Sequence, residues 1–301
     1  MAGLQNFKIA ALAVAIVAGF VAETQAQQNG RPPMRQHTAT KAQSIQLVSA
    51  NRSLKGAKVQ ETISGATRII RTTGLPDHAV GRFPNEGNPH AIKAQNKTYK
   101  MSANPKVGRA RDLKLAQLFG VAVNGVPFDP GAAEFWQGNP RSGWQYEALG
   151  GAVLLGVDSN YAHVQPTGTY HYHGLPIGLM QNLSWSKNTA SPLIGYAADG
   201  FPIYAITAQK NGEIAKMTSS YRLKSGNRPG GRQPGGRHDG AFVQDWTYVK
   251  GAGSLDECNG AVVKTADYPQ GTYAYFLTDS FPVIPRCLKG KPNSSFMNRP
   301  A

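Results

Sequence analysis

The chain has 301 residues, of which 41% are hydrophobic, enough to fill the core of one large domain or two ordinary ones. Its 32 Lys and Arg residues outnumber 17 Asp and Glu, and the resulting formal charge of +15 favours acidic partners. The sequence contains no nucleic-acid-binding motif, and after residue 26 no apolar run approaches the ~20 residues of a membrane-spanning helix. It therefore predicts neither a nucleic-acid partner nor a transmembrane span.

The first predicted element is a signal peptide at residues 1–26. Lys8 precedes the apolar run IAALAVAIVAGFVA, and the small residues of TQA, which end at Ala26, suit cleavage. A retained N-terminal anchor is the alternative interpretation. We expect an exported protein, periplasmic or extracellular.

The rest of the chain is predicted to hold one mainly β domain. Residues 27–64 are polar, basic and poor in aromatic residues, which indicates a flexible lead-in. The domain is expected over residues 65–290, and residues 291–301 are expected to form a loose tail. With 34 Gly and 20 Pro, and with short runs rich in Tyr, Val, Ile and Thr, we expect short strands and hairpins, sandwich- or barrel-like, with many Gly/Pro turns and little helix.

The segment HVQPTGTYHYHG at residues 163–174 predicts a β-hairpin. Pro suits the second position of a turn and Gly accepts a left-handed conformation, so Pro166-Thr167-Gly168 forms a three-residue loop. This loop places His163 opposite His171. The segment PQGTYAYF at residues 269–276 repeats the frame without histidine, and the same geometry would place Ala266 opposite Ala274.

The hairpin register predicts a metal site. Alternate strand residues share a face, so His171 and His173 point the same way, and His163 joins them from the neighbouring strand. Three imidazoles form an open cap for a transition metal, with zinc or copper preferred, and leave a fourth position for water or substrate. Cross-strand aromatic packing is the alternative interpretation, and the sequence identifies no substrate.

Further candidates lie near this hairpin or in loops. Tyr161 is expected to face His173, while His78, His238 and the adjacent Asp239 are candidates to complete the site or to orient a ligand. No G-x-S-x-G nucleophile elbow, P-loop or dinucleotide fingerprint is present.

The C-terminal half adds a disulfide and a basic loop. Cys258 and Cys287 are the only cysteines, and in an exported protein they are expected to form a structural disulfide. The loop YRLKSGNRPGGRQPGGRHDG holds Arg228, Arg232 and Arg237 among glycines. These arginines suggest the alternative function, a non-catalytic module that binds an anionic polysaccharide or the envelope surface.

Several segments in a fixed order resemble one protein family. They are GLPDHAVGRFPNEGNPH, TYHYHGLP, IGYAADGFPIYA, RHDGAFVQDWTYVKGAGSLDECNG and GTYAYFLTDSFPVIPRCLKG. Together they resemble the exported YHYH-domain proteins over residues 65–290. The resemblance implies a YHYH domain, with Cys258 and Cys287 in matching positions, and it implies no specific chemistry.

Overall fold

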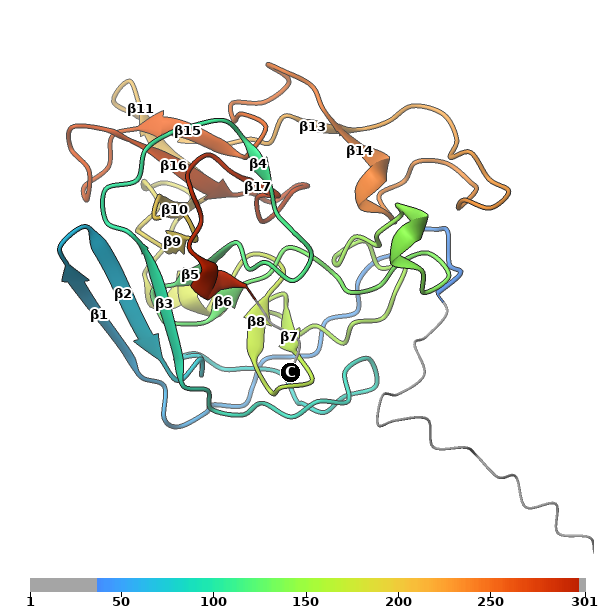
Figure 1. The fold of residues 1–301 in the computed structure, drawn as a ribbon, viewed down its shortest axis with the longest axis horizontal. Coiled ribbons are helices and arrows are strands. Elements are labelled where there is room, and N and C mark those ends of the chain that lie inside the picture. The colour runs from blue at the N-terminus through green and yellow to red at the C-terminus, as the bar shows by residue number, and fades with distance from the viewer. Residues whose placement is uncertain (1–36, 298–301) are drawn as a thin grey trace, which may run out of the picture. The chain divides into compact units, whose positions relative to one another are not determined.

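The computed structural model describes residues 37–297, and the predicted signal peptide lies outside the described residues. The described part is mainly β with little helix, which confirms the predicted fold class. Its strands form one large sheet and four small sheets, and none of them closes into a barrel (Figure 1). No helix in this part is long and apolar enough to cross a membrane.

The central sheet has eight short strands and contains both parallel and antiparallel pairs. In spatial order they are β15 (Gly260–Val263), β16 (Thr272–Leu277), β10 (Pro202–Ala205), β9 (Gly195–Ala197), β5 (Gly120–Ala122), β6 (Pro127–Phe128), β8 (Tyr170–Tyr172) and β7 (Ala162–Val164). Most residues of these strands are buried, so the sheet carries much of the main hydrophobic core.

Smaller elements surround this sheet. One is a three-stranded antiparallel sheet of β1 (Val59–Ser64), β2 (Thr67–Thr72) and β3 (Lys97–Ser102). The two-stranded sheets pair β11 (Thr207–Lys210) with β12 (Glu213–Lys216), β13 (Tyr221–Leu223) with β14 (Trp246–Tyr248), and β17 (Cys287–Leu288) with β4 (Arg111–Asp112). The helical elements are α1 (Ile177–Asn182) and the 3-10 turns η1 (Pro140–Ser142), η2 (Val243–Asp245) and η3 (Ser294–Phe296).

The segment expected to be a flexible lead-in lies against the domain from residue 37 onward. The backbone N–H groups of Gln43, Val48 and Arg52 donate to carbonyls of the domain at 3.0 Å, and residues 59–64 form β1. Its polar composition gave little sign of this, because the segment attaches through these backbone groups and a few scattered apolar side chains, such as Ile45 and Leu54, rather than through a regular apolar pattern. The ordered chain therefore begins before the expected boundary at residue 65.

The expected loose tail also packs on the core where the structure describes it. Phe296 of η3 is fully buried, its carbonyl accepts from the N–H of Leu118 at 2.9 Å, and its ring lies 4.9 Å from that of Tyr99. One large aromatic side chain is enough to hold a short segment, since its burial is worth about 1.5–3 kcal/mol.

The second hairpin does not have the expected register. Ala274 pairs with Ala261 instead of Ala266, because residues 264–271 form a longer loop closed by mutual backbone hydrogen bonds between Thr265 and Tyr268. The shared Pro-x-Gly-Thr-Tyr frame forms the same turn in both copies, since the Gly271 N–H donates to the Tyr268 carbonyl at 3.0 Å, but it sets the strand register only in the first hairpin.

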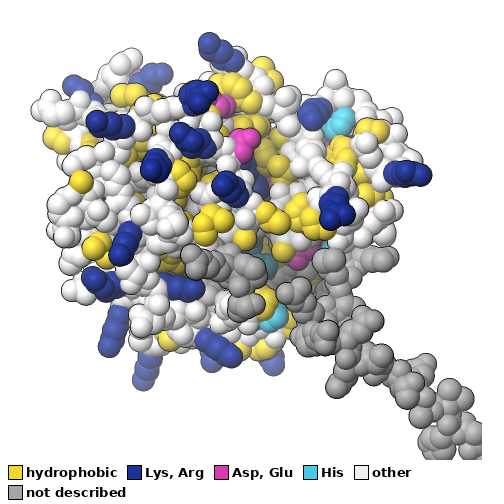
Figure 2. Space-filling model, viewed as in Figure 1, with side chains coloured by type: hydrophobic (Ala, Val, Ile, Leu, Met, Phe, Trp, Pro, Cys, Tyr) yellow, Lys and Arg dark blue, Asp and Glu magenta, His cyan; other side chains and the backbone are white. Residues whose placement is uncertain are grey.

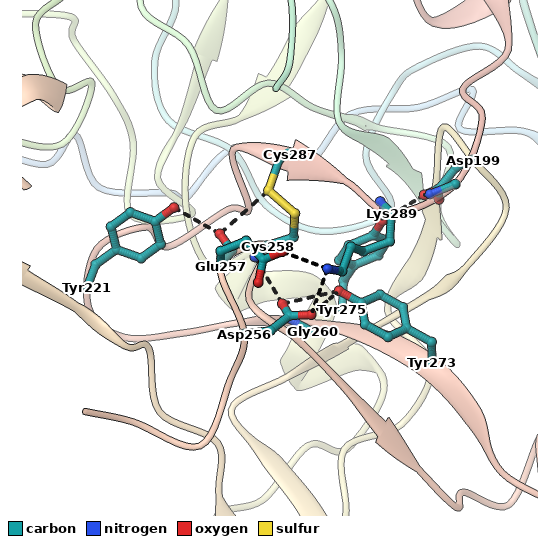
Figure 3. Close-up of a disulfide and its surroundings, with 11 residues drawn as sticks. Asp199, Tyr221, Asp256, Glu257, Cys258, Gly260, Tyr273, Tyr275, Cys287 and Lys289 are labelled. Atoms are coloured by element: carbon teal, nitrogen blue, oxygen red, sulfur yellow. Dashed lines mark hydrogen bonds and ion pairs between the residues drawn. A yellow bond between two sulfur atoms is a disulfide. The ribbon is translucent and has the colours of Figure 1, made fainter. Parts of the chain in front are cut away.

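The expected disulfide is present and joins Cys258 to Cys287, with their Cα atoms 5.1 Å apart. Figure 3 shows the polar groups around it. The Glu257 carbonyl accepts from the Tyr221 hydroxyl at 2.8 Å, and its carboxylate pairs with Lys289 at 2.6 Å. The bond ties β17 to the segment that leads into β15, so it connects the central sheet to a peripheral one.

Candidate metal centre

The loop between β7 and β8 sets the register of the site. Gly168 has φ 88° and its N–H donates to the Gln165 carbonyl at 2.8 Å, which closes a three-residue turn. His163 then pairs directly with His171. The register predicted from the sequence is confirmed.

The three histidine rings converge on one point. The Nε2 atom of His173 lies 3.0 Å from Nε2 of His171 and 3.0 Å from Nε2 of His163. The ring centroids are 4.6, 4.6 and 4.7 Å apart, and the rings are inclined to one another by 65–73°. The three Nε2 atoms therefore face one another at a common point, which we call the histidine hub.

Backbone carbonyls fix which ring nitrogen carries the proton. Nδ1 of His163 donates to the Leu155 carbonyl at 2.8 Å, and Nδ1 of His171 donates to the Thr169 carbonyl at 3.2 Å. A carbonyl only accepts, so in a neutral imidazole the opposite nitrogen, Nε2, carries a lone pair. Two lone pairs therefore face the hub, and Nε2 of His173 lies beside both.

Burial keeps all three imidazoles neutral. It lowers the pKa of His163 to about 4, although the hydrogen bond to Leu155 acts in the opposite direction, and the charge of His90 adds to the lowering. For His171 and His173, burial and the neighbouring His163 hold the pKa well below the usual value. At neutral pH the hub therefore presents uncharged nitrogen donors, the form in which histidine binds metal ions.

The donor set fits a transition metal ion. At Zn–N distances of ~2.0–2.1 Å, the nitrogens of a tetrahedral centre lie roughly 3.3 Å apart, close to the 3.0 Å seen here. Within the described chain, these three residues form the one group of His, Cys, Asp or Glu side chains close enough to hold a metal. Imidazole suits zinc and copper.

The tyrosines of the YHYH tetrapeptide lie on the other face of β8. The Tyr170 hydroxyl donates to Asp158 Oδ2 at 2.7 Å, and the Tyr172 hydroxyl lies 2.6 Å from Nε2 of His78. Because Nδ1 of His78 donates to the Ala79 carbonyl, its Nε2 accepts from Tyr172. His78, a candidate additional ligand, therefore braces the hairpin from behind and is not part of the histidine cluster.

The loop candidates have other partners. His238 is outside the histidine cluster and contacts the Ser225 carbonyl at 3.2 Å. Asp239 binds the Arg228 guanidinium at 2.5 Å. Tyr161 contributes its backbone carbonyl, which accepts from the His173 N–H at 2.7 Å.

Arg228 does not belong to an anion-binding surface. Its side chain has no exposed area and is held between Asp239 and Asp245, the latter at 2.6 Å. An external anion would have to displace both carboxylates. The Gly-rich sequence around Arg228 suggested a solvent-exposed loop. It gave no sign of the two carboxylates that bury Arg228, because these lie 11 and 17 residues away in the sequence.

Two residues near the histidines were not identified from the sequence. Burial raises the pKa of Asp129 to about 6, and this carboxylate accepts from the Gln165 side chain at 3.1 Å. Gln165 is two residues from His163, and this spacing could have indicated from the sequence that both side chains lie on the same face of the hairpin. Asp129 follows β6, whose parallel pairing with β8 has no local signature in the sequence.

Comparison with known families places this hairpin in context. The family model described as YHYH protein matches residues 98–290, which include the three histidines and both cysteines. The chain belongs to the YHYH protein family. In this YHYH domain β1 and β2 precede the matched segment. No curated protein and no solved structure matches the chain.

Proposed function

We propose that this YHYH protein is exported and binds one transition metal ion, zinc or copper, through Nε2 of His163, His171 and His173. The observation that carries the proposal is the meeting of the three Nε2 atoms at a buried hub, where backbone carbonyls hold the lone pairs of His163 and His171 inward. Without a cation, a neutral His173 has at most one N–H to offer to the lone pairs of His163 and His171, whereas a bound cation accepts a lone pair from all three Nε2 atoms.

The rest of the proposal follows from the shape of the site. Three protein ligands leave a fourth coordination position, as in zinc sites that bind water or substrate. His163 is the most exposed of the three, so its side is the route by which an ion enters. Export is supported by the disulfide, since such bonds persist in oxidising compartments.

Metal content of the purified mature protein tests the proposal. After loading with zinc and dialysis, we expect elemental mass spectrometry to find about one zinc ion per chain. The cobalt-substituted protein should show the visible absorption of a four-coordinate ion. His163→Ala should abolish both signals, and His238→Ala, which removes a histidine outside the cluster, should abolish neither. Negligible metal in the wild type would refute the proposal.

A second candidate function is binding of an anionic polysaccharide or envelope surface. Figure 2 shows Lys and Arg side chains spread over one face with few acidic ones among them, and Arg232 and Arg237 are exposed. This function predicts salt-sensitive binding to an acidic polysaccharide. Such binding should survive His163→Ala and weaken in an Arg232→Gln/Arg237→Gln variant. Binding whose affinity changes neither with salt concentration nor in this variant would refute the second candidate function.

A further inference from the structure

A cavity of about 390 Å³ lies apart from the histidine hub. Segments far apart in the sequence line it, and they contribute three aromatic side chains, three carboxylates and several aliphatic and hydroxyl groups. The aromatic residues are Tyr161, Trp246 and Phe281, and the carboxylates are those of Glu147, Asp239 and Asp279. This volume is in the range of small-molecule sites, roughly 300–1,000 Å³.

Each carboxylate in the lining already has a cationic partner. Glu147 pairs with Arg286, Asp239 pairs with Arg228 at 2.5 Å, and Asp279 pairs with Lys216 at 2.6 Å. The partner cations are not part of the lining, which among the described residues contains no Lys, Arg or His. A cationic ligand would find its counter-charges neutralised, and an anionic ligand would meet carboxylates first.

The same carboxylates still have free acceptor capacity. A carboxylate offers about four lone-pair sites. Asp239 already accepts from Arg228 and from the backbone N–H groups of Ala42 and Ala241, whereas Asp279, which is paired with Lys216, keeps more room for hydroxyl donors. Ser280 and Thr278 add hydroxyl groups to the wall. The polar part of the lining therefore suits a neutral ligand that is rich in hydroxyl groups.

The remaining wall is aromatic and aliphatic. The rings of Trp246 and Phe281 stack at 4.7 Å with an angle of 8° between them, and Leu149, Leu175 and Val283 lie beside them in the lining. A ligand with an apolar face would pack against this wall.

We propose that this cavity binds a neutral saccharide unit. A pyranose ring has an apolar C–H face for the Trp246–Phe281 wall and hydroxyl donors for the neutralised carboxylates. It carries no charge, which matches a lining whose charges are already paired. The proposal does not depend on the metal site, because none of the three histidines lines the cavity.

Binding of cellotetraose, tetra-N-acetylchitotetraose and maltotetraose to the whole protein tests this inference by NMR of the indole N–H groups. The chain has four Trp residues, so the spectrum has four such signals, and Trp246→Phe assigns one of them. We expect the Trp246 signal to shift saturably with at least one oligosaccharide while the other three stay in place. The absence of a saturable shift at ~10 mM of every oligosaccharide would overturn the proposal.

Affinity measurements on two matched variants complete the test. Trp246→Leu removes the aromatic wall and should weaken binding at least tenfold, whereas Trp144→Leu removes a Trp outside the cavity and should leave binding unchanged. Neither a chelator nor His163→Ala should alter the affinity, which separates this result from the fate of the metal proposal. Equal affinity in the wild type and Trp246→Leu, or binding lost on chelation, would overturn the inference.

Discussion

At the scale of single residues, the chemistry of each histidine follows from what holds its second nitrogen. His163 and His171 donate to backbone carbonyls and turn a lone pair to the hub, whereas His78 accepts from Tyr172 with the nitrogen that would otherwise be free. The sequence gives the number and parity of the histidines. It does not give their hydrogen-bond partners, because Leu155 and Ala79 come from loops with no local signal.

The buried histidines make the metal-free protein sensitive to acid. The pKa of His163 is about 4 in the folded protein and ordinarily 6.5, so the unfolded state binds its proton first. Above pH 6.5 the neutral histidines therefore do not lower the free energy of unfolding, and below it the free energy of unfolding falls as the pH falls towards 4. We expect the free energy of unfolding to fall by up to about 1.4 kcal/mol per pH unit for each histidine in that window.

Denaturant titrations of chelator-treated protein at pH 7 and pH 5 measure this effect. A variant with Gln at all three positions should lose most of the pH slope, and His238→Gln should keep it, because His238 lies outside the buried cluster. The same slope in the wild type and the triple variant would contradict the explanation.

Arg228 and Arg232 show that basic residues in one loop have different roles. Arg228 is fully buried between two carboxylates, and Arg232 is exposed. Arg228→Gln leaves the Asp245 carboxylate buried without its cation, so we expect a loss of about 3–5 kcal/mol of unfolding free energy. Arg232→Gln should change it by less than about 0.5 kcal/mol. Thermal and denaturant unfolding measure both, and equal effects would contradict the assignment.

At the scale of elements, the two hairpins with the same Pro-x-Gly-Thr-Tyr frame mark the limit of prediction. In the first, a loop of three residues fixes the register and hence the site. In the second, backbone bonds between Thr265 and Tyr268 lengthen the loop and shift the partner of Ala274. Turn chemistry is readable locally, but the choice between a short and a long loop depends on how the flanking strand packs in the sheet.

The pair Gly168 and Gly271 tests the link between loop geometry and metal binding. Both have left-handed φ angles, 88° and 93°, so Ala at either position costs about 1–2 kcal/mol of backbone strain. A Cβ on Gly168 would also lie 2.7 Å from the Lys93 side chain, whereas on Gly271 the nearest atom is 3.7 Å away. We expect Gly168→Ala to weaken zinc binding, and Gly271→Ala to lower stability while zinc binding stays intact. Unfolding and zinc titrations distinguish the two, and unchanged zinc affinity in Gly168→Ala would contradict the link.

At the scale of the whole molecule, composition predicted the fold class but not its limits. Short Gly- and Pro-bounded runs indicated a mainly β domain, and the structure has many short strands in five sheets. Ordered structure extends beyond the expected domain ends, since residues 37–58 attach through backbone bonds and side chains such as Ile45 and Leu54, and Phe296 attaches through one buried ring. The strand order of the central sheet, which joins β15 to β7 through six intervening strands, also has no counterpart in local sequence.

The disulfide links these distant parts, because Cys258 and Cys287 are 29 positions apart in the sequence and both β15 and β16 lie between them. Closing a loop of this length restricts the unfolded chain and stabilises the fold by about 3–4 kcal/mol. We expect the Cys258→Ser/Cys287→Ser variant to lose that amount in denaturant titrations and still to bind zinc. The three histidines lie in β7, in β8 and directly after β8, outside the closed loop. A reductant should destabilise the wild type and leave the variant unchanged. If the oxidised and reduced wild type unfold at the same denaturant concentration, the bond does not stabilise the fold, and the attachment of β17 must rest on its buried residues Cys287 and Leu288 and its pairing with β4.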